Sequence, residues 1–362
     1  MRIKAITLTN GTLALWPDAS ELDVVVKMLR NTNPIRAGLL TRRRWLQFLG
    51  GMTAAAVVPM TPTRAADWPA RRVTVIVPYA AGGFTDVLAR LSAKYLTEKF
   101  GQPFIVENRP GAGGAIGATL VMNAQSDGYT LLFGSASQFG IAPLIEKINY
   151  DPDAFMPASI FGKIPFLLAV SSMFPADDVA GFIKVAKAAA HPLNASMTGF
   201  GATSHLLTVA FAAQAGFQAT PIPYNGSALA AAALLQGDVD LTWAGVSDLK
   251  PLVPSNKLKI LAVSAARRIS SLAEVPSISE TLENFSLETW NGYFAPPGVP
   301  RQIVDLLSQS VQEAAAEPDT RKRLLELGIE PVATTPKEMA ATIQSDKAFY
   351  RKAVEAAGLN QR

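Results

Sequence analysis

Short apolar, β-branched runs alternate with segments of helical periodicity from residue 73 onward. Val73–Val77 is the first such run and ends at Pro78, and residues 85–100 then repeat apolar side chains every three or four positions until Gly101. These patterns predict a strand followed by a helix. Because strands that alternate with helices tend to lie parallel under helices on both faces, the expected fold class is α/β.

The same alternation continues to the end of the chain. Further strands are predicted over residues 104–106, 129–133, 166–170, 239–243 and 259–263. Further helices are predicted over residues 115–123, 179–190, 206–215, 225–237, 301–315, 320–327 and 336–357. A chain of 362 residues is long enough for two domains of ordinary size, each with its own core.

The first 66 residues have a different character. Arg42, Arg43 and Arg44 precede an uncharged stretch over residues 45–63, and small residues follow it. This charged, apolar, small-residue order is typical of an export signal, and consecutive arginines before Trp45 indicate the twin-arginine type. A transmembrane anchor is disfavoured, because the apolar stretch is short and is interrupted by glycine and proline.

Processing is expected after Ala65 or Ala66. Residues 1–37 precede anything that a signal needs, so they resemble a mis-chosen start, with Met28 as the alternative first residue. Every other apolar run is interrupted by charge, glycine or proline before it could span a bilayer. The sequence therefore predicts an exported, soluble protein in the periplasm.

Composition excludes several kinds of chemistry. The sequence has no cysteine and two histidines, so disulfides, thiol nucleophiles, cysteine-ligated metals and a lipid-modified cysteine are excluded, and no metal or cofactor is expected. Basic residues number 33 against 29 acidic ones, but nine basic and three acidic residues lie in residues 1–65. The remaining 24 basic and 26 acidic residues give no positive field that would attract nucleic acid.

Two loops ahead of predicted helices have the composition of anion sites. The first, residues 78–86, contains Gly82 and Gly83, which permit close backbone approach, and Thr85, which is expected to cap the helix. The second, residues 198–205, places hydroxyl groups and amides before a helix. Ligands bind at the carboxyl ends of strands in open parallel sheets. Plain turns are the alternative for both loops.

Two other segments resemble sites of different chemistries. Residues 111–117 have the spacing GxGxxxG, which departs from the dinucleotide fingerprint, so a tight turn with close helix packing is favoured. Residues 134–138 resemble a nucleophile elbow but lack its second glycine. A periplasmic hydrolase that uses Ser135 or Ser204 with His205 is the competing class of function.

Several segments resemble the Bug family of periplasmic solute receptors, which serve tripartite tricarboxylate transporters. The most specific are ENRPGAGG at residues 107–114 and DGYTLL at residues 127–132. The resemblance covers residues 67–359 and includes the segments 68–69, 73–86, 202–206, 223–224, 258–263, 275–276 and 295–300.

This resemblance implies a two-lobed clamshell like that of type II periplasmic binding proteins, each lobe a mostly parallel sheet flanked by helices. Domain 1 is then expected over residues 67–162 and 291–362, and domain 2 over residues 163–290. In the family, backbone amides, hydroxyl groups and ordered waters hold a carboxylate between the lobes. The implied ligand-binding residues are Tyr79, Gly82, Gly83, Phe84, Thr85, Asp86, Ser135, Ser137, Ala202, Thr203, Ser204, His205 and Tyr224.

The resemblance also implies a function without catalysis. The chain would act as a monomer that delivers a small organic carboxylate to the membrane subunits of a tripartite tricarboxylate transporter. A ligand sensor that presents its closed form to a signalling protein is the alternative within this class.

Two departures from the family pattern bear on the ligand. Phe84 stands where a small residue is common, and Ala244 and Gly245 stand where many relatives carry Asp-Ser. The first change adds an apolar wall and the second removes a partner for an amine. We therefore expect a carboxylate with an uncharged or aromatic tail rather than an amino acid. Asp86 is either a partner for an ammonium or hydroxyl group or a charge at a helix N-terminus.

Overall fold

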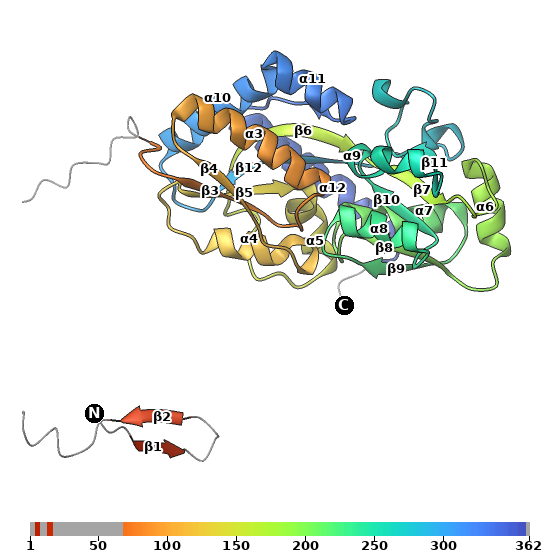
Figure 1. Cartoon of the computed structure of the whole chain (residues 1–362), viewed down its shortest axis with the longest axis horizontal. Helices are drawn as coiled ribbons and strands as arrows, with labels where there is room; N and C mark the ends of the chain where they lie inside the picture. The colour runs from red at the N-terminus through yellow and green to blue at the C-terminus, as the bar shows by residue number, and fades with distance from the viewer. Residues whose placement is uncertain (1–3, 8–12, 17–67, 360–362) are drawn as a thin grey trace, which may run out of the picture. The chain divides into compact units, whose positions relative to one another are not determined.

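The computed structural model describes residues 4–7, 13–16 and 68–359 (Figure 1). The chain divides into two compact units, residues 1–62 and 63–362. In the first unit, β1 (Lys4–Thr7) pairs antiparallel with β2 (Leu13–Trp16). The predicted export signal, its processing site and the alternative start at Met28 lie outside the described residues.

The second unit contains a six-stranded sheet of order β13-β6-β12-β5-β3-β4. β3 pairs parallel with β4 and with β5, whereas the β5–β12, β12–β6 and β6–β13 pairs are antiparallel. The strands are β3 (Val73–Val77), β4 (Phe104–Asn108), β5 (Thr130–Ser135), β6 (Met156–Pro165), β12 (Glu288–Ala295) and β13 (Glu330–Pro331).

Helices cover both faces of this sheet. α3 connects β3 to β4 and α4 connects β4 to β5, and right-handed crossovers in opposite directions put the two helices on opposite faces. Figure 1 shows α3 above and α4 below the strands. The helices are α3 (Phe84–Phe100), α4 (Ala115–Met122), α5 (Ala142–Ile145), α10 (Arg301–Ala316), α11 (Pro318–Glu326) and α12 (Pro336–Ala356), with the short turns η2 (Ala112–Gly114) and η3 (Ser137–Ile141).

A five-stranded sheet of order β11-β7-β10-β8-β9 forms the second lobe. Its strands are β7 (Leu167–Ser171), β8 (Leu193–Met197), β9 (Ala219–Pro223), β10 (Leu241–Ala244) and β11 (Leu258–Val263). Its helices are α6 (Val179–Ala188), α7 (Thr203–Ala215), α8 (Ser227–Gln236) and α9 (Val246–Leu249), with the short helices η4 (Lys250–Ser255), η5 (Ser270–Leu272) and η6 (Ile278–Glu280).

The predicted two-lobed α/β fold is confirmed, and both sheets are mixed. The expectation of mostly parallel sheets holds for one half of each: β4-β3-β5 in the first lobe and β10-β8-β9 in the second. The other half is antiparallel because β6 and β7 each run opposite to both of their neighbours, and β12 runs opposite to β5.

Two long strands connect the lobes. β6 leads through Phe166 directly into β7 of the second sheet, and β12 returns beside β6 with Glu288 opposite Pro165. The expected domain limits, at residues 162/163 and 290/291, fall inside these two strands and remain a prediction. A pair of continuous strands is well suited to act as a hinge, because it can bend without breaking its ladder of hydrogen bonds.

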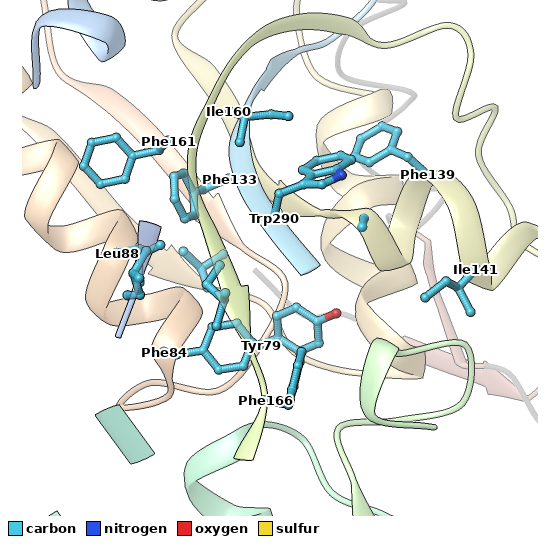
Figure 2. Close-up of a cluster of buried hydrophobic side chains, with 14 of the residues drawn as sticks. Tyr79, Phe84, Leu88, Phe133, Phe139, Ile141, Ile160, Phe161, Phe166 and Trp290 are labelled. Atoms are coloured by element: carbon cyan, nitrogen blue, oxygen red, sulfur yellow. The ribbon is translucent and has the colours of Figure 1, made fainter. Parts of the chain in front are cut away.

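Aromatic side chains fill the core of the first lobe. Phe139 stacks on Phe294 with ring centroids 3.8 Å apart, and Trp290 stacks on the same Phe139 at 6.2 Å. Figure 2 also shows Phe133 beside Phe161; these rings pack 6.5 Å apart on the opposite face of the sheet, where Phe133 lies against Tyr293 at 5.0 Å. Burial of such rings supplies much of the hydrophobic stabilisation of a lobe. Within the described residues, no helix combines the length and apolar character needed to cross a membrane.

Candidate functional site

A small cavity lies between the lobes and has a volume of about 10 Å³. This is roughly the space of one water-sized sphere. Both lobes contribute to its wall, and no charged side chain belongs to it. The lining residues are Tyr79, Ala80, Gly83, Phe84, Thr85, Ser135, Ser137, Phe166, Thr198, Thr203, Ser227 and Thr289.

The first predicted loop brings the start of α3 to the cavity. Gly83 is the N-cap residue and no side chain caps the helix, so the prediction that Thr85 is the cap is wrong; Thr85 is the second helical residue. A Cβ on Gly83 would lie 2.6 Å from Ser227 Oγ in the other lobe. A side chain at position 83 would therefore displace the Ser227 hydroxyl that faces it from the other lobe.

Asp86 holds the first loop in shape and does not line the cavity. Its Oδ2 accepts hydrogen bonds from Gly82 N at 3.0 Å and from Arg90 Nε at 2.9 Å, and its Oδ1 accepts one from Asn108 Nδ2 at 2.9 Å. Burial raises the pKa of Asp86, but these three donors together hold it below the ordinary value. The carboxylate is ionised and already partnered, as expected of a charge at a helix N-terminus.

Gln138 organises the polar wall of the first lobe. Its Nε2 donates to the Tyr79 hydroxyl at 2.8 Å and to the carbonyl of Gly113 at 3.0 Å. Its Oε1 accepts from Ser135 N at 2.8 Å and from Ser135 Oγ at 2.9 Å. This buried amide fixes Tyr79 and Ser135 toward each other, and no local sequence pattern points to such a role.

The second predicted loop brings the start of α7 to the same cavity. Ala202 is the N-cap residue of α7. The backbone N–H of Thr203 donates across the lobes to Ser137 Oγ at 3.0 Å, and the two hydroxyl oxygens are 3.1 Å apart. Ser204 points back into its own loop, where its Oγ accepts from Thr198 N at 2.9 Å.

His205 and Tyr224 lie beside the site without lining the cavity. His205 is 3% exposed, and its Nδ1 accepts a hydrogen bond from Gly201 N at 3.3 Å. Burial lowers the pKa of His205 to about 4, so the ring is neutral at neutral pH. Among the hydrogen bonds of the described residues, none joins His205 to Ser135 or to Ser204.

Five residues of the cavity wall are missing from the predicted set; Ala80 and Thr198 lie within the two predicted loops, and the other three lie outside them. Ser227 is the first residue of α8, and the signal was present in the Asn-Gly-Ser sequence before an alanine-rich helix. Phe166 lies at the passage from β6 to β7. Thr289 lies on β12, is 2% exposed, and its Oγ1 has no hydrogen-bond partner among the described residues.

The starts of three helices give the cavity its electrostatic character. Gly83 and Phe84 begin α3, Thr203 begins α7 and Ser227 begins α8, and all four residues line the cavity. A helix N-terminus has free N–H groups and a partial positive charge, so it attracts anions. Hydroxyl groups add further donors. This arrangement is suited to a carboxylate without any lysine or arginine.

Phe84 and Phe166 form the apolar wall of the cavity. Their rings meet edge to face, with centroids 5.6 Å apart and an interplanar angle of 86°. Figure 2 shows both rings beside the hydroxyl-bearing ring of Tyr79. Gly245 lies against Phe84, since a Cβ at position 245 would be 3.2 Å from Phe84 Cβ. One wall of the cavity is therefore apolar while the others donate hydrogen bonds.

Comparison with known proteins identifies the family. The family model described as "Tripartite tricarboxylate transporter family receptor" matches residues 88–359. The chain belongs to this family. It is 31% identical over 311 residues to the protein BugT of Bordetella pertussis, covering 84% of this chain and 94% of BugT. The resemblance to the Bug family is thereby confirmed.

Two solved structures of receptors from Rhodopseudomonas palustris share the fold of this tripartite tricarboxylate transporter receptor. Rpa4515 with adipate is 33% identical with a TM-score of 0.80, and the match covers 82% of this chain and all of Rpa4515. MatC with bound malate is 32% identical with a TM-score of 0.74, and the match covers 79% of this chain and all of MatC.

Proposed function

We propose that this chain is a periplasmic receptor that captures a small organic carboxylate between its lobes and delivers it to the membrane subunits of a tripartite tricarboxylate transporter. The observation that carries the proposal is an uncharged cavity at which three helices begin. Structures of relatives with adipate and with malate support the same class of ligand.

The ligand contacts that we propose belong to the residues at the cavity wall. Of the predicted set, these are Tyr79, Gly83, Phe84, Thr85, Ser135, Ser137 and Thr203, to which Ser227 and Thr289 are added. The other predicted residues support the loops that carry them: Gly82, Asp86, Ala202, Ser204, His205 and Tyr224. Hydrogen bonds to a charged group contribute about 1.5–3 kcal/mol each. Several of them, less the ordering costs, reach the roughly −8 kcal/mol of micromolar binding.

Binding requires the lobes to move. A cavity of about 10 Å³ cannot hold an organic acid, so the ligand enters when the lobes separate at β6 and β12. Closure around the ligand excludes water and creates a surface that combines both lobes. A membrane partner that recognises this surface then distinguishes loaded from empty receptor. Such a cycle needs only one copy of the chain, so the proposed receptor acts as a monomer. Its proposed route of export is the twin-arginine route.

The apolar wall favours a particular kind of carboxylate. The cavity offers donors to one acid group, and the Phe84–Phe166 pair offers a surface to an apolar tail. A second charged group on the ligand would meet no side chain of opposite charge on this wall. The proposed ligand is therefore a carboxylate with an uncharged or aromatic tail, and amino acids are expected to bind poorly.

The test is a thermal-shift screen of the purified protein. Benzoate, hexanoate, adipate, malate, aspartate and glutamate are compared with benzamide and hexanamide, which have the same shapes without the charge. A ligand that binds only the folded form raises the melting temperature. We expect benzoate or hexanoate to raise it and the amides to leave it unchanged. Tight binding of aspartate without benzoate would reject the ligand class, and no response to any acid would reject the receptor function.

A second measurement separates a receptor from a hydrolase. The bound acid is recovered by mass spectrometry after incubation with the protein, and a receptor returns it unchanged. Ser204 Oγ already accepts a hydrogen bond from Thr198 N, which favours a structural hydroxyl over a nucleophile. Turnover of an ester substrate that a His205→Ala variant loses would favour the hydrolase instead.

A further inference from the structure

Asp248 is a buried carboxyl group next to the cavity that the proposed ligand contacts do not use. It lies on α9, directly after β10. The backbone N–H of Gly245 donates to its Oδ2 at 3.0 Å. Its Oδ1 is shielded from solvent and has no hydrogen-bond partner among the described residues. An ionised carboxylate with an unused, desolvated oxygen is unfavourable, so this group is sensitive to any further negative charge nearby.

The neighbours of Asp248 are the residues that a bound carboxylate would contact. The Ser227 hydroxyl and the backbone N–H of Phe84 both act on its carboxyl group, and both residues line the cavity. A Cβ on Gly245 would lie 3.1 Å from Asp248 Oδ2 and 3.2 Å from Phe84 Cβ, so Gly245 contacts both residues. Asp248 and a ligand in the cavity therefore have the same neighbours, Phe84 at the start of α3 and Ser227 at the start of α8.

No cation compensates for the charge of Asp248 among the described residues packed around it. Of the elements packed against α9, helix α3 carries Asp86 and Arg90, which are bonded to each other at 2.9 Å; further along it, Lys94 pairs with Glu98 and Lys99 pairs with Glu313. The adjoining η4 carries Lys250, which is exposed, while α8 and β7 carry no ionisable side chain. Burial raises the pKa of Asp248 to about 7, although the Ser227 hydroxyl and the N–H groups of Gly245 and Phe84 oppose that rise.

We propose that Asp248 takes up one proton from solvent when a carboxylate occupies the cavity, so that ligand binding is linked to proton uptake. The inference rests on the proposed function. A negative charge brought next to a buried carboxylate disfavours the ionised form of that carboxylate, and the effect is strong in a site of low dielectric. The proton adds to a carboxylate oxygen of Asp248, which becomes a neutral acid. The ligand keeps its charge, because an unperturbed carboxyl group has a pKa of about 4, well below that of Asp248.

The linkage has a defined direction. Below about pH 7 Asp248 is already protonated in the free protein. Ligand binding then takes up almost no further protons, and the affinity for the ligand does not change with pH. Above that pH each binding event takes up a proton, and affinity falls by up to about tenfold per pH unit. The receptor would then load best at neutral or acidic pH and release its ligand more readily at alkaline pH.

Titration calorimetry tests the proposal, with benzoate and hexanoate as the probes. The wild type, Asp248→Asn and Asp238→Asn are titrated at pH values between about 6 and about 8.5, which bracket the transition. Each titration is repeated in phosphate and in Tris, because the difference in binding enthalpy between the two buffers counts the protons taken up. Asp238 lies just after α8 and its side chain is exposed, so Asp238→Asn serves as the matched control.

We expect the wild type and the Asp238 variant to take up close to one proton at alkaline pH, and the Asp248 variant to take up none and to keep its affinity. Equal proton uptake by the wild type and the Asp248 variant, or no uptake by the wild type, would overturn the inference alone. No binding of either probe at any pH would overturn the proposed function together with it. Even if Asp248→Asn does not fold, the difference in wild-type binding enthalpy between the two buffers still tests whether ligand binding takes up a proton.

Discussion

The ring of Phe84 occupies the space that a side chain at position 245 would need. A Cβ on Gly245 would lie 3.2 Å from both Cβ and Cδ1 of Phe84, on the facing lobe. The φ angle of Gly245 is −71°, which any residue can adopt, so the obstacle to a side chain there is the space taken by Phe84 and not the backbone conformation. The two departures from the family pattern noted in the sequence are therefore one structural unit: the large residue at 84 fits because residue 245 has no side chain.

This pairing predicts a non-additive double mutant. Gly245→Ser forces the closed lobes apart at Phe84 and is expected to lower the free energy of unfolding by about 1–3 kcal/mol. Phe84→Ala alone loses its contact with Phe166 and is expected to cost about 3 kcal/mol. In the double variant the serine enters the space left by the ring, so urea denaturation should show a coupling of about 1 kcal/mol or more. Strictly additive effects would contradict the pairing.

A second prediction concerns the contact between the lobes at Gly113. Its φ angle is +59°, and a Cβ there would lie 2.0 Å from the carbonyl oxygen of Phe200 in the other lobe. Gly113→Ala should therefore prevent full closure and weaken benzoate binding by at least about tenfold, since several contacts of about 1 kcal/mol are lost together. Isothermal titration measures the affinity.

Gly101→Ala is the matched control for this effect. Gly101 has a similar φ angle of +64° and ends α3, and a Cβ added there would have no neighbouring atom within 4 Å. Both substitutions incur the same left-handed backbone strain of about 1 kcal/mol. Gly101→Ala should lower the free energy of unfolding by about 1 kcal/mol and should bind benzoate as tightly as the wild type. Equal affinities in the two variants would mean that Gly113 does not govern closure.

The elements that the sequence predicts best are those with a strong local signal. The first strand is predicted with its observed bounds, Val73–Val77, and α3 is predicted one residue short of its observed start. The sequence pattern misses β12 because seven of its eight residues are buried, so the alternation of apolar and polar residues that marks a half-buried strand is absent. It misses β9 because this strand contains Pro221 and Pro223, which are tolerated at the edge of a sheet.

The two loops that precede α3 and α7 could be predicted from local sequence, whereas Ser135 and Ser137 were named from the family resemblance and Ser227 before α8 was missed. The loops before α3 and α7 follow strands and carry glycine and hydroxyl residues, so their role could be inferred from local sequence. Gln138, Thr289 and Asp248 act through residues distant in the sequence, and such contacts leave no local pattern. The expected cap at Thr85 was wrong because Gly83, two residues earlier, occupies the cap position of α3.

A third prediction concerns Thr289. Its Oγ1 is buried at the cavity wall without a hydrogen-bond partner among the described residues, so it is available to the ligand. Thr289→Val, which has the same shape, should weaken benzoate binding roughly tenfold to hundredfold, because a hydrogen bond to a charged group is lost. The same change should leave the ligand-free protein equally stable or more stable, as it removes an unsatisfied polar group.

Thr289→Ser keeps the hydroxyl group and is the matched comparison. It should bind benzoate within about twofold of the wild type, a difference smaller than the value of one hydrogen bond. If Thr289→Val binds as tightly as Thr289→Ser, the hydroxyl does not contact the ligand.

The last prediction concerns acid stability and the buried ring of His205. Its pKa is about 4 in the folded protein against 6.5 in the unfolded chain, so the unfolded chain binds more protons between these values. The free energy of unfolding should therefore fall as the pH falls from 6.5 to 4, by about 3 kcal/mol at 1.36 kcal/mol per pKa unit. His205→Asn retains an acceptor for Gly201 N and should lose this dependence.

Asp248 changes the free energy of unfolding in the opposite direction over the same pH range. Its pKa is raised from 3.8 to about 7 in the folded protein, so the folded state binds more protons and stability falls as the pH rises through that interval. The two buried groups therefore oppose each other in the wild type. Urea denaturation of the single variants between about pH 4 and about pH 7 separates them: His205→Asn should become relatively less stable with rising pH and Asp248→Asn relatively more stable. Parallel pH profiles for the two variants would show that neither group carries the proton linkage assigned to it.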